Sequence, residues 1–296
     1  MFDRLKIGDK EVFVVRNHHQ ALAAWASVRR ACTNPPNLIT IDHHTDVYEA
    51  FLGHAAWRVN TGEISEEAGV AKRNAMVSAI DWKSDASVAH AIESLQHDEH
   101  IDAATRSGVL KSAFAIQLSD GGGYPSMEET AHERAVAIAW QRQARPPSPL
   151  TGLRTYAPAE NGIYVISHEC AIGCKKKTHD DQCVIDHAQQ IIESPYLDDQ
   201  LARGARIAEC LGMMAVDAEP YILDIDLDVF HSRKATAPDD PSTLHRLVRG
   251  ALAITIATEP ECVEDLWHGD DPMESKELLD AVLLHIRQAL TAKASE

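Results

Sequence analysis

The chain has 296 residues and an acidic composition, with 28 lysine and arginine residues against 45 aspartate and glutamate residues and a formal net charge of −17. Its 45% hydrophobic and 25% charged residues are typical of a folded globular domain. A charge this negative argues against nucleic acid as a partner, because phosphates need a basic face, and favours a cationic substrate or a bound metal ion. A membrane partner is not expected either, since no apolar stretch approaches the roughly 20 residues that span a bilayer.

The N-terminal residues and the cysteines indicate the compartment. The segment MFDRLKIGDKE at 1–11 lacks the apolar core of a signal peptide. The six cysteines are spread through a long chain, which is not the pattern of a disulfide scaffold. We therefore expect a cytoplasmic protein with reduced thiols. An oligomer is compatible with the sequence but is not specified by it.

Short β-rich segments alternate with longer helical ones along the chain. The first half predicts strands at 11–16, 38–42 and 112–118, helices at 20–30 and 128–143, and a mostly helical stretch at 63–107. After a proline-rich break at 145–149, the second half predicts strands at 162–167, 221–226 and 251–258, helical sequence at 184–214, and a closing amphipathic helix from Glu274.

Strands that are apolar on both faces and alternate with helices indicate a parallel sheet covered by helices. We therefore predict an α/β fold with three α/β/α layers around a mainly parallel sheet. The proline-rich break is interpreted as a loop, because strands resume directly after it. Residues 1–296 are then expected to form a single domain.

Histidine or carboxylate side chains follow four of the predicted strands where each strand ends, at His18 and His19, at 42–46 (DHHTD), at 224–228 (DIDLD), and at Glu259. The carboxyl ends of parallel strands meet at one edge of a sheet, and ligands bind there. These side chains are therefore expected to lie close together. Such groups can also be solvated turns or helix caps, but four strand ends together favour a functional site.

Spacing indicates what this site binds. Asp42, His44 and Asp46 are two residues apart and point the same way in an extended segment, and the three aspartates of 224–228 share that relation. Carboxylates this dense repel one another and raise their own pKa values, a penalty that a divalent cation removes. Many carboxylates with few imidazoles suit Mn²⁺ better than a thiolate-preferring zinc site.

These residues resemble the ureohydrolase (arginase) superfamily, which holds two manganese ions with an Asp-x-His-x-Asp segment, an Asp-x-Asp segment and an earlier histidine. The segments VFVVRNHHQALAAW, LITIDHHTD and YILDIDLDVF are similar to a narrower branch, the peptide arginases, which convert arginine to ornithine within ribosomally made precursor peptides. The resemblance is densest in residues 11–46, 96–118 and 221–260. It implies an arginase-like catalytic domain.

The resemblance also implies that six side chains hold two Mn²⁺ ions per chain, with Asp42 and Asp224 between the ions, His18 and Asp46 at one ion, and His44 and Asp226 at the other. His19 remains an alternative to His18, because neighbouring histidines point differently. Asp228 is expected to bind no metal itself but to hydrogen-bond a metal-bound histidine and so orient it.

Further roles carried over from the family are catalytic. Glu259 falls where arginases hold the substrate guanidinium, and Asp46 would pass a proton to the leaving amine after a metal-activated water attacks the guanidinium carbon. His100 is nominated as a proton shuttle, although a lone histidine is more often a helix-surface residue. Glu99 is nominated for substrate binding, or it occupies the first turn of a helix, where acids are favoured.

The predicted activity is manganese-dependent hydrolysis of arginine side chains in a precursor peptide to ornithine and urea. The sequence lacks the Gly-Gly-Asp-His segment of arginase and the Asp-Pro after the second metal motif, which puts free arginine in doubt as the substrate. Alternatives are a ureohydrolase acting on free arginine or another guanidino or amidino compound, and a deacetylase using one zinc held by Asp42, His44 and Asp224. A metal-dependent module that only binds arginine-rich peptides is a third reading.

A second group of potential ligands lies in SHECAIGCKKKTHDDQC and comprises His168, Cys170, Cys174, His179 and Cys183. Its spacing does not match a standard zinc module. We favour an ordered loop near the cleft, with a zinc site or a disulfide as the alternatives, and interpret the lysines at 175–177 as a solvated face.

Overall fold

The computed structural model describes residues 2–118, 122–167, 170–268 and 271–291. It contains one sheet of seven strands: β1 (Asp3–Ile7), β2 (Lys10–Val15), β3 (Asn37–Asp42), β4 (Ala113–Gln117), β5 (Ile163–Ser167), β6 (Tyr221–Asp226) and β7 (Ala253–Ala257). The strand order is β1-β2-β7-β6-β3-β4-β5, and all neighbours are parallel except β1 and β2. The prediction of a mainly parallel sheet is confirmed.

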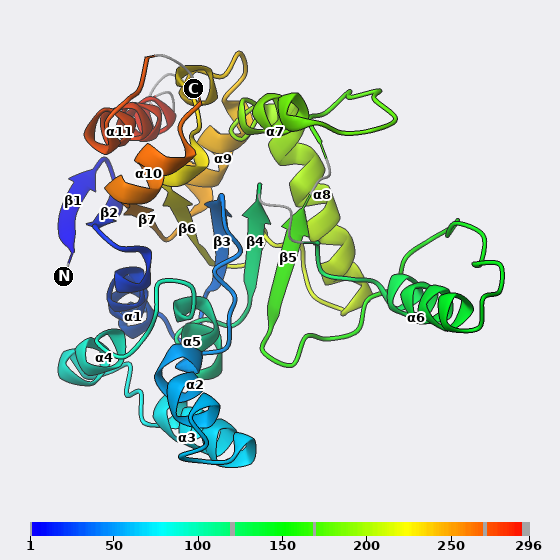
Figure 1. The fold of residues 1–296 in the computed structure, drawn as a ribbon. Helices are drawn as coiled ribbons and strands as arrows, with labels where there is room; N and C mark the ends of the chain where they lie inside the picture. The colour runs from blue at the N-terminus through cyan, green and yellow to red at the C-terminus, as the bar shows by residue number, and fades with distance from the viewer. Residues whose placement is uncertain (1, 119–121, 168–169, 269–270, 292–296) are drawn as a thin grey trace.

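The described residues form eleven α-helices: α1 (Ala21–Ala31), α2 (Leu52–Asn60), α3 (Glu66–Ser78), α4 (Asp85–Ile92), α5 (His100–Arg106), α6 (Met127–Gln141), α7 (Asp181–Ala188), α8 (Ser194–Cys210), α9 (Ser242–Gly250), α10 (Pro260–Leu266) and α11 (Ser275–Thr291). Short 3₁₀ helices are η1 (His18–Gln20), η2 (Leu227–Val229) and η3 (Arg233–Thr236). Figure 1 shows α1 to α5 grouped on one side of the sheet and α7 to α11 on the other, while α6 projects from the body.

The core has two halves, one on each face of the sheet. Alternate strand residues point to opposite faces, so Leu38 and Ile222 join the cluster around Trp25 of α1, whereas Ile39 and Leu223 join the cluster under α8, α9 and α11. Because both faces of the central strands are buried, their sequences are continuously apolar. The three-layer α/β/α prediction is therefore confirmed.

Some elements of the fold were not predicted from the sequence, for physical reasons. Strand β1 has the sequence DRLKI, is largely exposed and pairs on one side only, so it lacks the apolar run of the buried strands. The predicted helical stretch at 184–214 divides into α7 and α8, and α8 restarts with Pro195 in its first turn. Helices α2, α9 and α10 were also not predicted, because at seven to nine residues each is too short for its helical pattern to stand out. Within the ranges given above, the chain has no helix long and apolar enough to cross a membrane.

Strand register brings the predicted site segments to one edge. Asp42, the last residue of β3, pairs with the last residue of β4, and its neighbour Ile41 pairs with Ile225 of β6. Asp226 and Val15 both pair with Ala257, the last residue of β7. The strands therefore end in step, and the residues that follow them share one edge of the sheet.

Candidate metal centre

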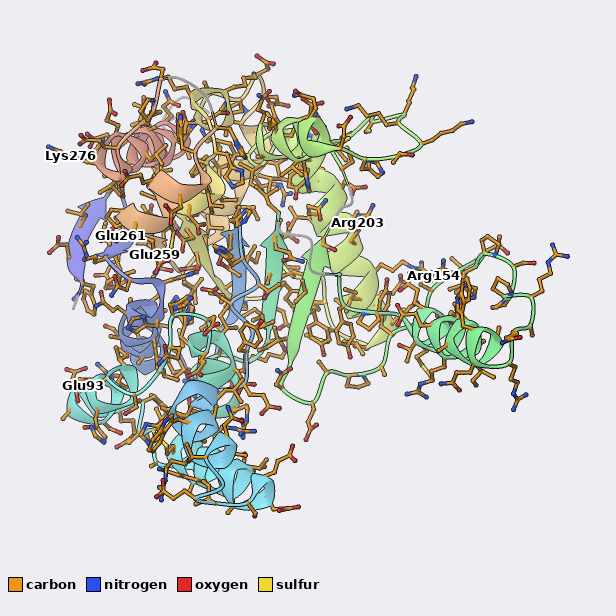
Figure 2. All side chains as sticks on the ribbon, in the orientation of Figure 1. Glu93, Arg154, Arg203, Glu259, Glu261 and Lys276 are labelled. Atoms are coloured by element: carbon orange, nitrogen blue, oxygen red, sulfur yellow. The ribbon has the colours of Figure 1, made fainter. Side chains whose placement is uncertain are left out.

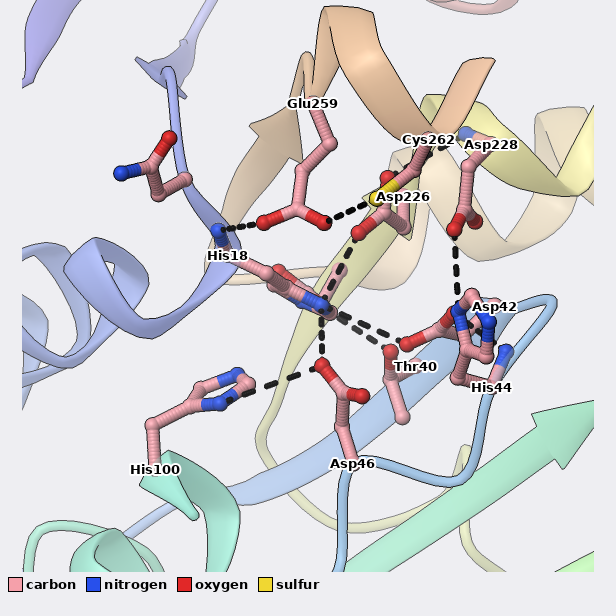
Figure 3. Close-up of polar contacts among 12 residues, drawn as sticks. His18, Thr40, Asp42, His44, Asp46, His100, Asp226, Asp228, Glu259 and Cys262 are labelled. Carbon is pink, nitrogen blue, oxygen red and sulfur yellow. Dashed lines mark hydrogen bonds and ion pairs between the residues drawn. The ribbon is translucent and has the colours of Figure 1, made fainter. Parts of the chain in front are cut away.

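His18 lies in the middle of a group of carboxylates at this edge (Figure 3). Its side chain is fully buried, and Nδ1 is 2.9 Å from Asp46 Oδ2, 3.1 Å from Asp226 Oδ2 and 3.3 Å from Asp42 Oδ2. Within the described part of the chain, His18 Nδ1 and Asp42 Oδ2 have no hydrogen-bond partner of ordinary geometry. Buried polar atoms are seldom left so, which indicates that these atoms converge on a position for an ion.

A second group shares Asp42 with the first. His44 Nδ1 is 3.0 Å from Asp228 Oδ2, and Asp42 Oδ1 accepts a 2.8 Å hydrogen bond from the His44 amide. Asp228 is buried, yet neither of its carboxylate oxygens finds a hydrogen bond among the residues that the structure describes. The ligand atoms of Asp42, His44 and Asp228 lie within 4.8 Å of one another, as do those of His18, Asp42 and Asp226. Both groups could hold a metal ion.

The electrostatics of the cluster show an uncompensated negative charge. Burial, together with the charge of Asp46, raises the pKa of Asp42 to about 8 from 3.8, and burial raises the pKa values of Asp46 and Asp226 as well. For His18, burial acts to lower the pKa, but the carboxylates of Asp224 and Asp226 outweigh it and raise the pKa well above 6.5. The raised pKa values mean that the cluster binds protons, which neutralise the negative charge that a divalent cation would otherwise neutralise.

Asp224 lies behind His18, inside the sheet. It pairs with Thr40 of β3 and Thr255 of β7, and both hydroxyls donate to its carboxylate, the first at 2.8 Å. The Trp25 indole in turn donates to Thr255 Oγ1 at 3.1 Å. His18 Nε2 is 2.7 Å from Asp224 Oδ2, so Nε2–H donates to this carboxylate, and Nδ1, on the other side of the ring, is the nitrogen that would give up its proton to bind a cation.

This arrangement differs from what the resemblance implies for segment 224–228. Neither described group includes Asp224, whereas Asp226 belongs to one group and Asp228 to the other. The cause is register: Asp224 sits two residues before the end of β6, Asp226 is its last residue, and Asp228 lies beyond it in η2. The structure also places His18, and not His19, among these carboxylates.

The residues that hold Asp224 were missed by sequence reasoning. Thr40 and Thr255 are single hydroxyls in otherwise apolar strands, and Trp25 looks like an ordinary core residue of a helix. Their common role becomes visible only when the register of β3, β6 and β7 is known. The one usable signal was a polar residue on a strand that is buried on both faces.

Glu259 lies beside the cluster at the start of α10. Its Oε1 accepts a 2.6 Å hydrogen bond from the His18 amide, and its Oε2 accepts one from Cys262 Sγ at 3.4 Å. Burial and the charge of Glu259 raise the pKa of this thiol to about 12, so Cys262 remains protonated. Glu259 and Asp46 both have positive φ, +26° and +46°, and strained backbone of this kind is concentrated at functional sites.

A pocket of about 300 Å³ opens next to Glu259. Its wall includes the carboxylates of Glu259 and Glu261 and the imidazoles of His19 and His97, and Figure 2 shows both glutamates near the same end of α10. Burial lowers the pKa of His19, which favours its neutral form. Glu261 also pairs with the exposed Arg16 at 2.6 Å, so Glu259 is the carboxylate through which the pocket suits a cationic group.

His100, at the start of α5, is brought to the cluster. Its ring is fully buried, stacks on Trp25 with centroids 5.2 Å apart, and lies 4.5 Å from the His18 ring. Its Nδ1 is 4.0 Å from Asp46 Oδ2. Burial, reinforced by the charge of His18, lowers the pKa of His100 well below 6.5, so the ring is neutral at neutral pH.

Glu99 makes its hydrogen bonds with backbone amides and not with the carboxylate cluster. Its Oε1 accepts a 2.6 Å hydrogen bond from the Gly53 amide, and its Oε2 accepts a 3.0 Å bond from the Gln96 amide. With both oxygens on backbone amides, Glu99 ties the start of α2 to the turn before α5. These contacts account for its burial without a substrate.

Comparisons with family models, with curated proteins and with solved structures found no match for this chain. What can be said of the chain therefore comes from its structure. It is an α/β protein whose seven-stranded mixed sheet carries buried histidine and aspartate groups that could hold metal ions.

Proposed function

We propose that this protein is a manganese-dependent hydrolase that converts arginine side chains of a peptide to ornithine with release of urea. The observation that carries the proposal is the pair of ligand groups that share Asp42 and lie beside the acidic pocket containing Glu259. The resemblance of segments 11–46 and 221–260 to peptide arginases supports the same reaction.

In this proposal, six side chains hold two cations, with Asp42 common to both positions, His18, Asp46 and Asp226 at one, and His44 and Asp228 at the other. Four carboxylates and two imidazoles suit Mn²⁺. When bound, two such ions supply Lewis acidity and lower the pKa of a water molecule, which is what hydrolysis of a guanidinium requires. Asp228 here takes the place that the resemblance gave to Asp226, and Asp226 replaces Asp224 but belongs to one position only.

The protein's own residues orient the substrate and move the proton. Glu259 would accept hydrogen bonds from the guanidinium and hold its carbon beside the cluster, so that much of its effect is positional. Asp46 would carry the proton of the attacking water to the leaving amine, which departs as ornithine while the carbon leaves as urea. The neutral His100 would exchange that proton, and its 4.0 Å distance from Asp46 supports this role.

The substrate class follows from charge and size. A pocket of about 300 Å³ is at the small end of ligand sites, which suits one extended side chain. The net charge of −17 would attract a cationic peptide over a longer range. The departures from the arginase motifs that surround free arginine favour arginine within a peptide.

The test is mass spectrometry of arginine-containing peptides incubated with the full chain and Mn²⁺. Each arginine converted lowers the peptide mass by about 42 Da, the difference expected when hydrolysis turns a guanidino group into an amine. Glu259→Gln should lose most of this activity, whereas Glu264→Gln, a matched exposed glutamate of the same helix, should retain it. Unmodified peptides across varied sequences, together with turnover of free arginine, would overturn the peptide substrate.

Metal analysis separates the alternatives. Two manganese ions per chain that disappear in Asp42→Asn support the proposed hydrolase. One zinc lost in Asp42→Asn, with removal of acetyl groups from acetyl-lysine peptides, would instead support a deacetylase. Binding of arginine-rich peptides without urea release would indicate a binding module.

A further inference from the structure

The segment between β5 and α7 brings four potential ligands together, far along the chain from the carboxylate cluster. The sulfur atoms of Cys170, Cys174 and Cys183 and a ring nitrogen of His179 all lie within 4.8 Å of one another. His168, which the sequence grouped with them, lies outside the described residues. Sequence spacing alone did not predict this convergence, because the ligands are separated by three, four and three residues.

Local structure explains how the segment folds back. The Cys174 amide donates to the Ala171 carbonyl at 3.1 Å, closing a turn in which Gly173 has a φ of +85°, a conformation that residues with a side chain rarely adopt. Cys183 lies in the first turn of α7, where its amide donates to the N-cap carboxylate of Asp180 at 3.2 Å. The backbone thus holds both ends of the loop in place.

The apolar cluster around these residues contains too few side chains to be a hydrophobic core. Cys170 and Cys183 are 3% and 2% exposed and pack with Ala171 and Cys174 in a cluster separate from the two main cores. His179 and most of the intervening residues are exposed. Three thiols and one methyl group bury little apolar surface, so another interaction is needed to order a loop of this length.

The donor set identifies that interaction. Around a tetrahedral zinc ion with Zn–S bonds of about 2.3 Å, sulfur atoms lie about 3.8 Å apart. Atoms already within 4.8 Å therefore need only a small contraction. Three cysteines with one histidine are a known ligand set of structural zinc, and soft thiolates favour zinc over the manganese suited to carboxylates.

Charge around the cluster is also suitable. Three thiolates and a neutral histidine with Zn²⁺ carry a net charge of −1, and three consecutive lysines at 175–177 adjoin them in the sequence. Lys176 forms an ion pair with Asp180 at 2.7 Å, and its neighbours are exposed. With zinc bound, the basic run would offset the remaining negative charge of the site.

We propose that Cys170, Cys174, His179 and Cys183 bind one structural zinc ion, distinct from the carboxylate centre and independent of the hydrolase proposal. With four protein ligands the site has no open position for substrate. Zinc would anchor segment 170–183 to α7, beside the point where the Ile172 amide donates to Gln190 Oε1 at 2.7 Å. Figure 1 shows this segment as a long loop next to α7.

The test uses the full chain loaded with Zn²⁺, or with Co²⁺ as a spectroscopic substitute. We expect one zinc per chain that persists in Asp42→Asn, and sulfur-to-cobalt charge-transfer absorption, which carboxylate ligands cannot produce. Cys174→Ser should lose both, whereas Cys210→Ser, an exposed cysteine outside the cluster, should keep both.

A second variant, His179→Asn, tests the proposal even if Cys174→Ser fails to fold. His179→Asn changes an exposed side chain, so a folded protein is expected that releases zinc to a chelator faster than the wild type. Absence of charge-transfer absorption in the wild type, its full persistence in folded Cys174→Ser, or zinc release from His179→Asn at the wild-type rate would overturn the proposal. So would four rather than six titratable thiols in the denatured, chelator-treated chain, because that count shows a disulfide instead.

Discussion

Asp224→Asn tests whether this aspartate positions His18 or binds metal itself. The carboxylate accepts hydrogen bonds from His18 Nε2 and from the hydroxyls of Thr40 and Thr255. An asparagine is neutral and has one acceptor oxygen, so it must either leave the donor at the other oxygen without an acceptor or turn its amide toward Nε2. The second choice forces the other His18 tautomer and removes the Nδ1 lone pair needed for a metal.

The loss of one hydrogen bond to a charged group costs about 1.5–3 kcal/mol. We therefore expect Mn²⁺ affinity to fall by about 10–100-fold, the usual effect of removing a partner that orients a ligand. Titration calorimetry on metal-free protein measures this, and elemental analysis at saturating Mn²⁺ should still find two ions. Thr40→Val, which leaves the His18 contact intact, should lose less.

Two outcomes would refute this reasoning. A folded Asp224→Asn protein with wild-type Mn²⁺ affinity would show that the contact with Nε2 does not position the ring. Loss of bound manganese even at saturation, as expected for Asp42→Asn, would show that Asp224 is a ligand.

Three more predictions follow from the same site. Glu259→Gln should raise KM or lower kcat for arginine peptides while both manganese ions remain, and loss of an ion on elemental analysis would contradict its assignment to substrate. His100→Phe preserves the stacking on Trp25 but removes the ring nitrogens, so kcat should fall by about 10²–10⁴-fold if the ring relays protons; an unchanged kcat would exclude that role. In metal-free protein, the pKa of Asp42 is raised to about 8 from 3.8 and that of His18 above 6.5, so the folded state binds extra protons and thermal stability should fall as pH rises from about 4 to about 8. The stabilisation by Mn²⁺ in thermal melts should accordingly be larger at pH 8 than at pH 5, and the reverse order would contradict these shifts.

The buried strands were predictable because burial on both faces leaves a continuous apolar run, as in LITID and YILDID. Strand β1 was not, because an exposed edge strand of five residues has no such pattern. Helix boundaries were predictable where the amphipathic pattern was long, as at α1 and α11. They failed at α7 and α8, where a short interruption lay inside one helical pattern.

The candidate site was predictable as a location but not in detail. Strand ends identified His18, Asp42 and Glu259, because parallel strands end at the same edge. The aspartates of 224–228 could not be told apart, since a spacing of two gives all three the same direction on a strand. The strand's end does separate them, and it was predicted correctly at residue 226, but the roles of these aspartates were assigned from the resemblance and not from that boundary.

The strand order also constrains when the metal centre can form. Strands β2 and β3 are made early, but β7 and β6 lie between them in the sheet. His18 is separated from Asp224 by 206 positions and from Glu259 by 241, so its contacts are among the most non-local of the fold. Such contacts form late and slow folding, because long loops must close first. A nascent chain therefore cannot assemble the candidate centre until residues through β7 have been synthesised, and any metal ion that it binds would enter after the sheet is complete.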